Sequence, residues 1–98
     1  MAIVNGFKKL VMDSDFDLEA DTIKVMLLTS THTTNIDTQI YIDDVSTNEV
    51  TGTGYTAGGK ALANKAVTQD NANDLGKFDA DDVTWSSSTI TARYAVIY

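Results

Sequence analysis

The spacing of apolar positions near the start of the chain predicts a short helix followed by a strand. Phe7, Leu10 and Val11 stand at i, i+3 and i+4, so a helix over Asn5–Met12 would place them on one face. Residues 22–29, which read TIKVMLLT, form a nearly continuous apolar run rich in residues that favour strands. This run is typical of a strand in the middle of a sheet.

Polar segments separate and follow these two elements. Residues 13–21 alternate acids with small or apolar residues, which indicates an exposed connection anchored by Phe16 and Leu18. Residues 30–35 consist of Ser, Thr, His and Asn, a composition typical of a polar loop. Residues 38–45 fit both the alternation of a strand and the spacing of a helical face, so the pattern leaves their structure open.

The second half of the chain is glycine-punctuated sequence of high β propensity. Breaks rich in turn residues recur about every ten positions, which is the pattern of an antiparallel sandwich or a small barrel. A length of 98 residues suits one domain. We therefore expect a mainly β fold over residues 1–98: a small antiparallel β-sandwich or barrel with a short N-terminal helix. The β segments expected after residue 49 are Val50–Tyr55, Lys60–Thr68, Lys77–Phe78, Asp82–Trp85 and Thr89–Tyr98.

The last segment, Ile90–Tyr98, has a strong strand pattern that runs to the final residue. Free chain ends are usually polar and frayed. Two interpretations follow: the strand docks in the centre of a sheet, or the chain is a C-terminally shortened form of a longer product. An unpaired edge here would offer its backbone to a neighbouring subunit. Tyr94 in this segment and Trp85 before it are interpreted as core or interface anchors.

Charge and hydropathy remove several classes of partner. Fourteen acidic residues against seven basic ones give a net charge of −7, which repels nucleic acid phosphates and anionic lipid. No apolar run approaches the roughly 18 residues of a membrane span, and the first residues lack the pattern of a signal peptide. We expect a protein made in the cytoplasm that binds neither nucleic acid nor membrane.

The residue types that carry chemistry are few. The chain has no cysteine, which excludes disulfides and thiolate nucleophiles, and a single histidine, His32, which excludes a two-histidine zinc site. His32 stands among hydroxyl residues, so an arrangement of Ser or Thr, His and Asp stays open, but no G-x-S-x-G motif accompanies it. We expect His32 to be an exposed loop residue, and we expect no enzyme and no catalytic residue.

Two glycine patterns imitate nucleotide-binding motifs. Gly54–Ala61 fits G-x-x-x-x-G-K but has Ala61 in place of the Mg²⁺-binding hydroxyl residue, and Gly52–Ala57 fits G-x-G-x-x-A. Both motifs belong to a parallel sheet with helices, which a chain of this length and pattern does not supply. We interpret the glycines as turn or bulge residues, with Gly54 at positive φ, and we expect no cofactor-binding residue.

Acidic clusters are the remaining candidates for metal binding. Asp13, Asp15 and Asp17 match the first three ligand positions of an EF-hand loop, but Leu18 and Lys24 stand where that loop requires glycine and glutamate. Adjacent acids on a strand would point to opposite faces. We expect a solvated acidic surface and no metal site, with a weakly held cation as the alternative. The other acidic groups are Asp79, Asp81 and Asp82, and the adjacent pairs Asp43–Asp44 and Asp81–Asp82.

Four blocks of sequence in fixed order carry a family resemblance. They are Asp21–Leu28 (DTIKVMLL), Asn48–Gly59 (NEVTGTGYTAGG), Phe78–Trp85 (FDADDVTW) and Thr91–Tyr98 (TARYAVIY), preceded by an Asn-Gly-Phe segment at residues 5–7. With these blocks the chain resembles a widespread family of small tailed-bacteriophage virion proteins. Members of that family commonly continue past the last block with more strands.

The resemblance implies a structural protein of the virion that decorates or cements the outer capsid surface through contacts with the major capsid protein. The net charge of −7 favours the outer surface over the DNA-filled interior. Self-association as dimers or trimers at capsid symmetry positions is expected. The alternative is a tail, baseplate or fibre component involved in host attachment, and a third class is a hydrolase or a nucleotide-binding accessory protein.

Overall fold

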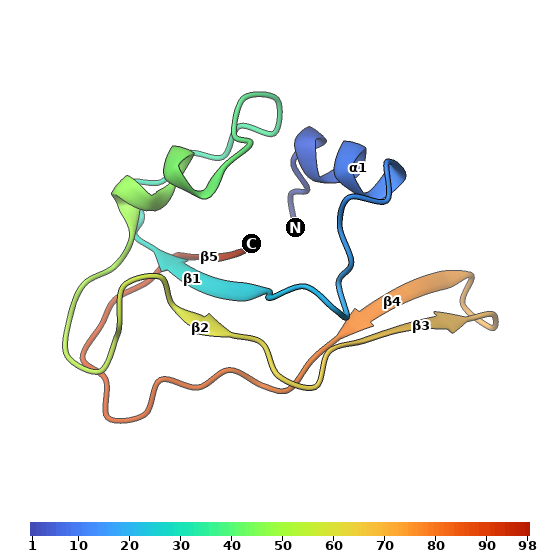
Figure 1. The fold of residues 1–98 in the computed structure, drawn as a ribbon. Helices are drawn as coiled ribbons and strands as arrows, with labels where there is room; N and C mark the ends of the chain where they lie inside the picture. Colours follow the sequence, from blue (N-terminus) through green and yellow to red (C-terminus); the bar gives the residue numbers. More distant parts are fainter.

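The computed structural model describes all 98 residues of the chain. Its regular elements are one α-helix, two short 3₁₀ helices and five strands, and every strand pair is antiparallel (Figure 1). A mainly β fold with a short N-terminal helix is thereby confirmed. In chain order the elements are α1 (Asn5–Met12), β1 (Lys24–Leu28), η1 (Ile42–Asp44), η2 (Ser46–Asn48), β2 (Lys60–Ala61), β3 (Ala66–Asp70), β4 (Leu75–Asp79) and β5 (Tyr94–Ile97).

The strands form two separate sheets. β1 is the middle strand of a three-stranded sheet in the order β2-β1-β5, while β3 and β4 form a two-stranded hairpin. β1 aligns with β5 from Val25 opposite Ile97 to Leu28 opposite Tyr94. Figure 1 shows the hairpin extending away from the three-stranded sheet, on the side of the molecule where α1 lies. Both sheets are open, with a free strand edge at each end.

The core lies on one face of the three-stranded sheet. Met26 and Leu28 of β1 are buried and pack against Val45, because alternate side chains of a strand point to the same face. Only six of the 98 residues are buried, so the core is small for a chain of this length. The partly buried residues that complete this cluster are Ile42, Val96 and Tyr98.

The local patterns of the first part of the chain agree with the structure. α1 spans the predicted residues Asn5–Met12, and β1 is the central strand expected within residues 22–29. Residues 13–21 contain no helix or strand, and Phe16 and Leu18 are half-buried there while their neighbours are exposed. The spacing of apolar residues was sufficient to place these elements.

The segment that the sequence left open, residues 38–45, forms a turn and the 3₁₀ helix η1. Oδ2 of Asp44 accepts hydrogen bonds from the backbone N–H groups of Ile40 at 2.8 Å and of Tyr41 at 2.9 Å. This carboxylate holds the chain in a bend, as a capping residue does at the start of a helix. Val45 enters the core directly after the bend. The segment is therefore neither a strand nor an amphipathic α-helix.

Several of the expected strands are wrong or shorter than expected. Val50–Tyr55 is not a strand, because glycines at positive φ interrupt it, and Asp82–Trp85 pairs with no partner strand. The expected strand Lys60–Thr68 divides into β2 and β3, because Asn64 between them adopts a φ of +51°, outside the strand region. Within Thr89–Tyr98 only β5 is a strand.

Candidate assembly surface

The glycine segment that imitates a nucleotide-binding loop forms a chain reversal that leads into a strand. Gly54 has a φ of +84°, as predicted, and a Cβ there would lie 2.7 Å from Cα of Ser88. Gly59 has a φ of +72°, and its Cβ would collide with the carbonyl oxygen of Val25. Lys60 then begins β2, whereas a phosphate cradle requires the start of a helix at this point. The glycines here permit close backbone approach.

Lys60 and two aromatic side chains pack together beside β2. The Lys60 ammonium group donates a hydrogen bond to the carbonyl oxygen of Thr84 and lies 5.7 Å from the centre of the Trp85 ring. Trp85 is half-buried, with its ring 5.8 Å from that of Tyr55. Trp85 therefore anchors an irregular segment to the sheet, although it does not lie in a strand. Tyr94, the other predicted anchor, lies in β5 and remains exposed.

His32 is buried, so the expectation of an exposed loop histidine is wrong. The residue is 7 % exposed, and its ring packs edge-on against Tyr94 with the ring centres 5.3 Å apart. Nε2 lies 3.1 Å from Oγ1 of Thr34, whereas Nδ1 is buried without a partner. An arrangement of Ser or Thr, His and Asp needs a carboxylate at the second ring nitrogen, and none is bonded there. Tertiary packing buries a residue whose sequence neighbours are polar.

The first acidic cluster holds the backbone of a turn. Oδ1 of Asp17 accepts hydrogen bonds from the N–H groups of Glu19 at 2.9 Å and Ala20 at 3.0 Å. Oδ2 of Asp13 forms an exposed ion pair with Lys9 at 2.7 Å. No group of three or more acidic or histidine side chains comes together in a way that could hold a metal ion. Asp17 therefore acts on the backbone of its own turn, and Asp13 on one lysine.

The second acidic cluster begins at Asp79, the last residue of β4, and continues with Asp81 and Asp82 in an irregular segment. Asp79 accepts a hydrogen bond from the N–H of Ala80 at 2.9 Å, and Asp81 accepts one from the Asn64 side chain at 2.5 Å. Neither adjacent pair of acids lies on a strand. Asp43–Asp44 belongs to η1, and Asp81–Asp82 belongs to an irregular segment. Hydrogen bonds from the backbone N–H groups, first that of Tyr41 and then that of Ile40, lower the pKa of Asp44.

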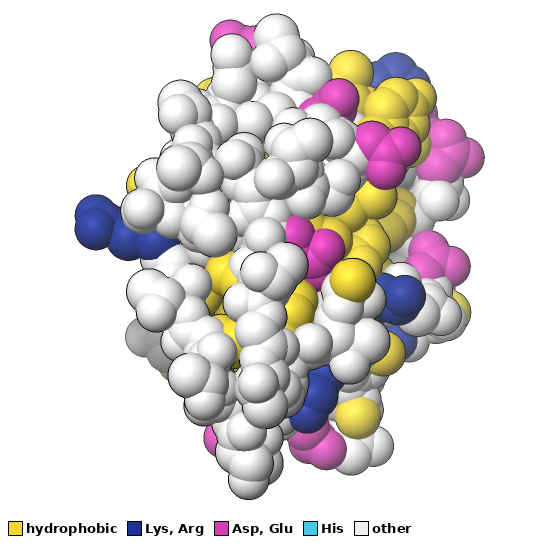
Figure 2. Space-filling model, turned by 90° about the vertical axis from the view of Figure 1, so that its left-hand side faces the viewer, with side chains coloured by type: hydrophobic (Ala, Val, Ile, Leu, Met, Phe, Trp, Pro, Cys, Tyr) yellow, Lys and Arg dark blue, Asp and Glu magenta, His cyan; other side chains and the backbone are white.

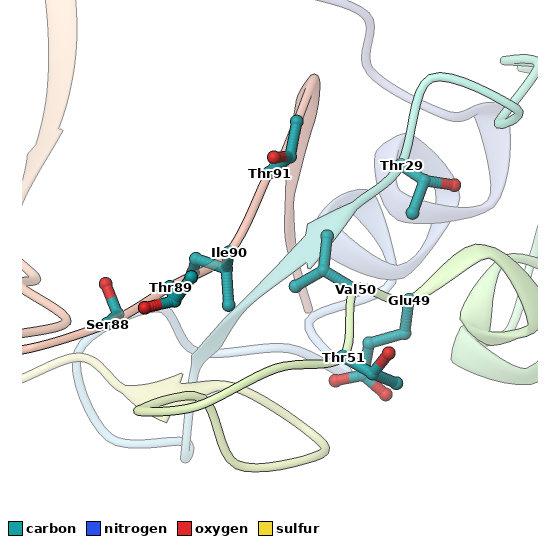
Figure 3. Close-up of a pocket in the computed structure, with 8 residues that line it drawn as sticks. All are labelled: Thr29, Glu49, Val50, Thr51, Ser88, Thr89, Ile90 and Thr91. Carbon is teal, nitrogen blue, oxygen red and sulfur yellow. The ribbon is translucent and has the colours of Figure 1, made fainter.

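An open hollow of about 590 Å³ lies where two chain segments diverge at the end of β1. Figure 3 shows Val50 and Ile90 on the two segments that flank this end of β1. Hydroxyl groups dominate the lining, Glu49 is its single titratable residue, and His32 is not part of it. The lining residues are Thr29, Glu49, Val50, Thr51, Ser88, Thr89, Ile90 and Thr91.

The Glu49 carboxylate belongs to a hydrogen-bond network that no sequence motif revealed. Its Oε1 accepts hydrogen bonds from the Tyr55 hydroxyl at 2.8 Å and from the N–H of Gly58 at 2.6 Å. The Tyr55 hydroxyl also accepts one from the N–H of Leu27 at 3.1 Å, and the Tyr98 hydroxyl donates one to the carbonyl oxygen of Gly58. Burial raises the pKa of Tyr55 to about 12. The network ties the glycine segment to β1.

The chain exposes more surface than a compact monomer of its mass. Its accessible surface of 6985 Å² is about 1,500 Å² larger than the roughly 5,500 Å² expected for 10.6 kDa. The radius of gyration is 14.6 Å, against about 13 Å for a compact domain of this length. Twelve large hydrophobic residues are exposed, and Figure 2 shows hydrophobic side chains gathered along one margin of a mainly polar face, with acidic side chains among them.

A group of apolar residues, of which Val11 and Val67 are exposed, lies between α1 and the β3–β4 hairpin. It lines an open hollow of about 450 Å³ with two acidic residues, and we call it the helix–hairpin surface. Phe16 of this surface packs edge-to-face against Phe7 of α1 with the ring centres 5.3 Å apart, and no residue of α1 is buried, so the apolar face of the helix is only partly covered. The surface consists of Val11, Phe16, Leu18 and Val67, with Asp17 and Glu19 beside them.

The outer edge of β5 is the second uncovered feature, and we call it the β5 edge (Tyr94–Ile97). β1 lies along one side of β5, and no strand lies along the other. Ile97 is 55 % exposed. The interpretation that this strand docks in the centre of a sheet is therefore wrong, because β1 takes that position.

Comparisons with protein-family models, with curated proteins and with solved structures found no match. The structure contains no helix of the length and apolar character that a membrane span requires. Functional inference therefore rests on the fold, on the chemistry of the residues described above and on the two uncovered surfaces.

Proposed function

We propose that this chain is a structural subunit of a bacteriophage virion, which decorates or cements the outer capsid surface through contacts with the major capsid protein. The observation that carries the proposal is the apolar surface that the folded chain leaves uncovered. Such a subunit needs surfaces that fit its neighbours, and it needs no active site. The resemblance of four sequence blocks to small virion proteins supports the same role.

The surplus of total accessible surface over that of a compact monomer is comparable with the area that protein contacts bury. The chain exposes about 1,500 Å² beyond a compact monomer. A standard interface covers about 800 Å² on each partner. Two such contacts per chain would bring its burial to the level of an ordinary domain, and a subunit in a surface lattice has at least that many neighbours.

The charge of the chain supports the outer surface of the particle. With a net charge of −7, the chain would be repelled by the phosphates of packaged DNA. On the face seen in Figure 2, acidic side chains lie among the lysine and arginine side chains, so this face offers no purely basic patch for a DNA backbone. An outward position avoids this repulsion and leaves the acidic side chains solvated.

The helix–hairpin surface suits the contact with the capsid protein. Its centre is apolar, and Asp17 and Glu19 stand beside it. An apolar centre with a charged rim is the arrangement of specific protein contacts. We infer that the capsid protein offers an apolar patch flanked by basic side chains.

The proposed role also accounts for the sandwich or barrel that the sequence predicts and that a single chain leaves open. The two sheets are open, and a two-stranded hairpin such as β3–β4 is marginally stable by itself. We propose that the sandwich or barrel expected from the sequence is completed when neighbouring subunits cover these open sheets. This would place the hairpin, which extends from the molecule, within an interface.

Quantitative mass spectrometry of purified phage particles tests the location. A copy number comparable with that of the major capsid protein supports the capsid role. A handful of copies per particle would instead assign the chain to the tail, baseplate or fibre. Absence of the chain from particles that are otherwise complete would overturn the virion proposal.

A pair of substitutions tests the helix–hairpin surface. Val67→Asp places a charge at its centre, where Val67 is 49 % exposed, and we expect the folded variant to be lost from particles. Thr68→Asp is the matched control, because the adjacent residue of β3 is exposed and points to the opposite face of the hairpin. Equal incorporation of both variants would show that the capsid contact lies elsewhere.

A further inference from the structure

The backbone of β5 has free hydrogen-bonding groups on the side away from β1. Lys24 and Tyr98 exchange two hydrogen bonds, of 2.7 and 2.9 Å, so alternate residues of β5 such as Val96 direct their backbone groups toward β1. The N–H and C=O groups of Ala95 and Ile97 therefore point outward. No turn or loop hydrogen bond engages them.

The other strand edges carry features that discourage pairing. β2 has only two residues, one of them Lys60, and the N–H of Val67 in β3 is bonded to the Glu19 carboxylate at 2.7 Å. β4 includes Lys77 and Asp79. Short strands, charges and covered N–H groups protect a sheet edge from other chains. β5, which reads YAVI, has none of these protections.

We propose that β5 pairs with β5 of a second copy of this chain, antiparallel and about a two-fold axis at Val96. In this register Ala95 lies opposite Ile97 of the other copy, so both outward-facing residues of each copy exchange hydrogen bonds. A two-fold axis at either neighbouring residue would pair fewer outward groups. The two three-stranded sheets become one continuous sheet in the order β2-β1-β5-β5-β1-β2.

The side chains fit this register. On the core face Val96 meets its own copy, and Tyr94 lies opposite Tyr98 of the other chain, pairs of the β-branched and aromatic kinds that stabilise neighbouring strands. On the other face Ile97, which is 55 % exposed, is covered beside Ala95. Residues 94–98 contain no charged side chain, so the acidic side chains of the two copies are kept out of the contact.

The uncovered area favours a second copy over a short foreign strand. One contact of about 800 Å² per chain accounts for roughly half of the surplus surface and leaves the helix–hairpin surface free for another partner. This inference rests on the proposed role as an assembling subunit. Its test uses the isolated chain, so incorporation into particles and self-pairing can each fail while the other holds.

Analytical ultracentrifugation of the isolated chain gives the first test. We expect the wild type to sediment with twice the mass of 10.6 kDa. Ala95→Pro removes an outward N–H and Ile97→Lys adds a charge to the edge, so both should sediment as single chains with an unchanged far-ultraviolet circular dichroism spectrum. A wild type of single-chain mass would overturn the second copy as occupant and leave the edge to a strand of another protein. Folded variants that keep the double mass would overturn the β5 contact.

Engineered cysteines test the register, because the chain has no cysteine of its own. In a non-hydrogen-bonded pair the two Val96 Cα atoms would lie roughly 4.5 Å apart, within disulfide reach, so Val96→Cys should oxidise to a covalent dimer. Ile97→Cys is the control. Ile97 lies opposite Ala95 of the other copy, so the two Ile97 residues are two positions apart along the strands and their Cα atoms lie roughly 8 Å apart, beyond that reach. Cross-linking of Ile97→Cys in preference to Val96→Cys, or of neither, would overturn the register.

Discussion

The Tyr55 hydroxyl donates a hydrogen bond to Oε1 of Glu49 across 2.8 Å. Burial, together with this nearby carboxylate, raises the pKa of Tyr55 from 10.0 to about 12. Because the neutral phenol is favoured in the folded chain, its contribution to stability is fully present below pH 10 and is lost as the pH rises toward 12. We expect the melting temperature of the wild type to fall across that window.

Ultraviolet titration of phenolate absorbance measures this effect directly. Burial also raises the pKa of Tyr98, so two of the four tyrosines should ionise late. Tyr55→Phe should remove one late step and reduce the alkaline fall in melting temperature, while Tyr41→Phe, at a 75 % exposed position, is the control and should leave both late steps in place. Simultaneous ionisation of all four tyrosines near the free value would contradict the buried network.

Gly54→Val tests the chain reversal in the glycine segment. A side chain there meets Ser88 and is strained at a φ of +84°, so we expect the free energy of unfolding to fall by about 1–3 kcal/mol. Gly76→Val is the control, because Gly76 lies in β4 with open space around its Cβ position. Urea denaturation of both variants gives the comparison. A loss as large for Gly76→Val as for Gly54→Val would mean that strain at Gly54 is not the cause.

Sequence periodicity predicted the elements that residues close together in the chain determine. The helix face of Phe7, Leu10 and Val11 and the apolar run of β1 are set by residues close together in the chain, so their spacing was sufficient. The positive φ of Gly54 was also predictable, because few other residues tolerate it. The first two features define the start of the fold and its central strand, and the third defines a chain reversal before β2.

Features that depend on distant partners were not predictable from one sequence. His32 is buried because Tyr94, from the far end of the chain, packs against its ring. Glu49 and Tyr55 meet across a turn without any motif, and Asn64 ends a strand that β propensity would have continued. The helix–hairpin surface and the β5 edge are exposed because no other part of the chain packs on them. The order of residues along one chain does not show which surfaces stay exposed after folding.

Asp44→Ala should lower the melting temperature more than Asp43→Ala at neutral pH. The Asp44 carboxylate accepts two backbone hydrogen bonds, and the structure gives Asp43 no such role. Because these bonds lower the pKa of Asp44 below 3.8, its contribution is present above that value and is lost as the pH falls through the lower folded pKa. The difference in melting temperature between the two variants should therefore vanish in strong acid. A difference that persists there would assign it to packing.

Removal of divalent cations should leave the stability unchanged. Asp17 accepts hydrogen bonds from its own turn, Asp13 pairs with a lysine, and no three acidic side chains converge. We expect equal melting temperatures by differential scanning calorimetry with EDTA and with added Ca²⁺. A rise of several degrees with Ca²⁺ would establish a cation site, because a ligand that binds only the folded chain stabilises it.

Substitutions of His32 separate packing from hydrogen bonding. His32→Ala should lower the free energy of unfolding by about 2 kcal/mol or more, because it leaves a cavity beside Tyr94. His32→Leu fills most of that space and removes the buried Nδ1 that lacks a partner, so it should cost about 1 kcal/mol or less despite the lost bond to Thr34. Thr34→Val isolates that bond. If His32→Leu is as damaging as His32→Ala, then Nδ1 makes a hydrogen bond inside the folded chain, such as one to an enclosed water molecule.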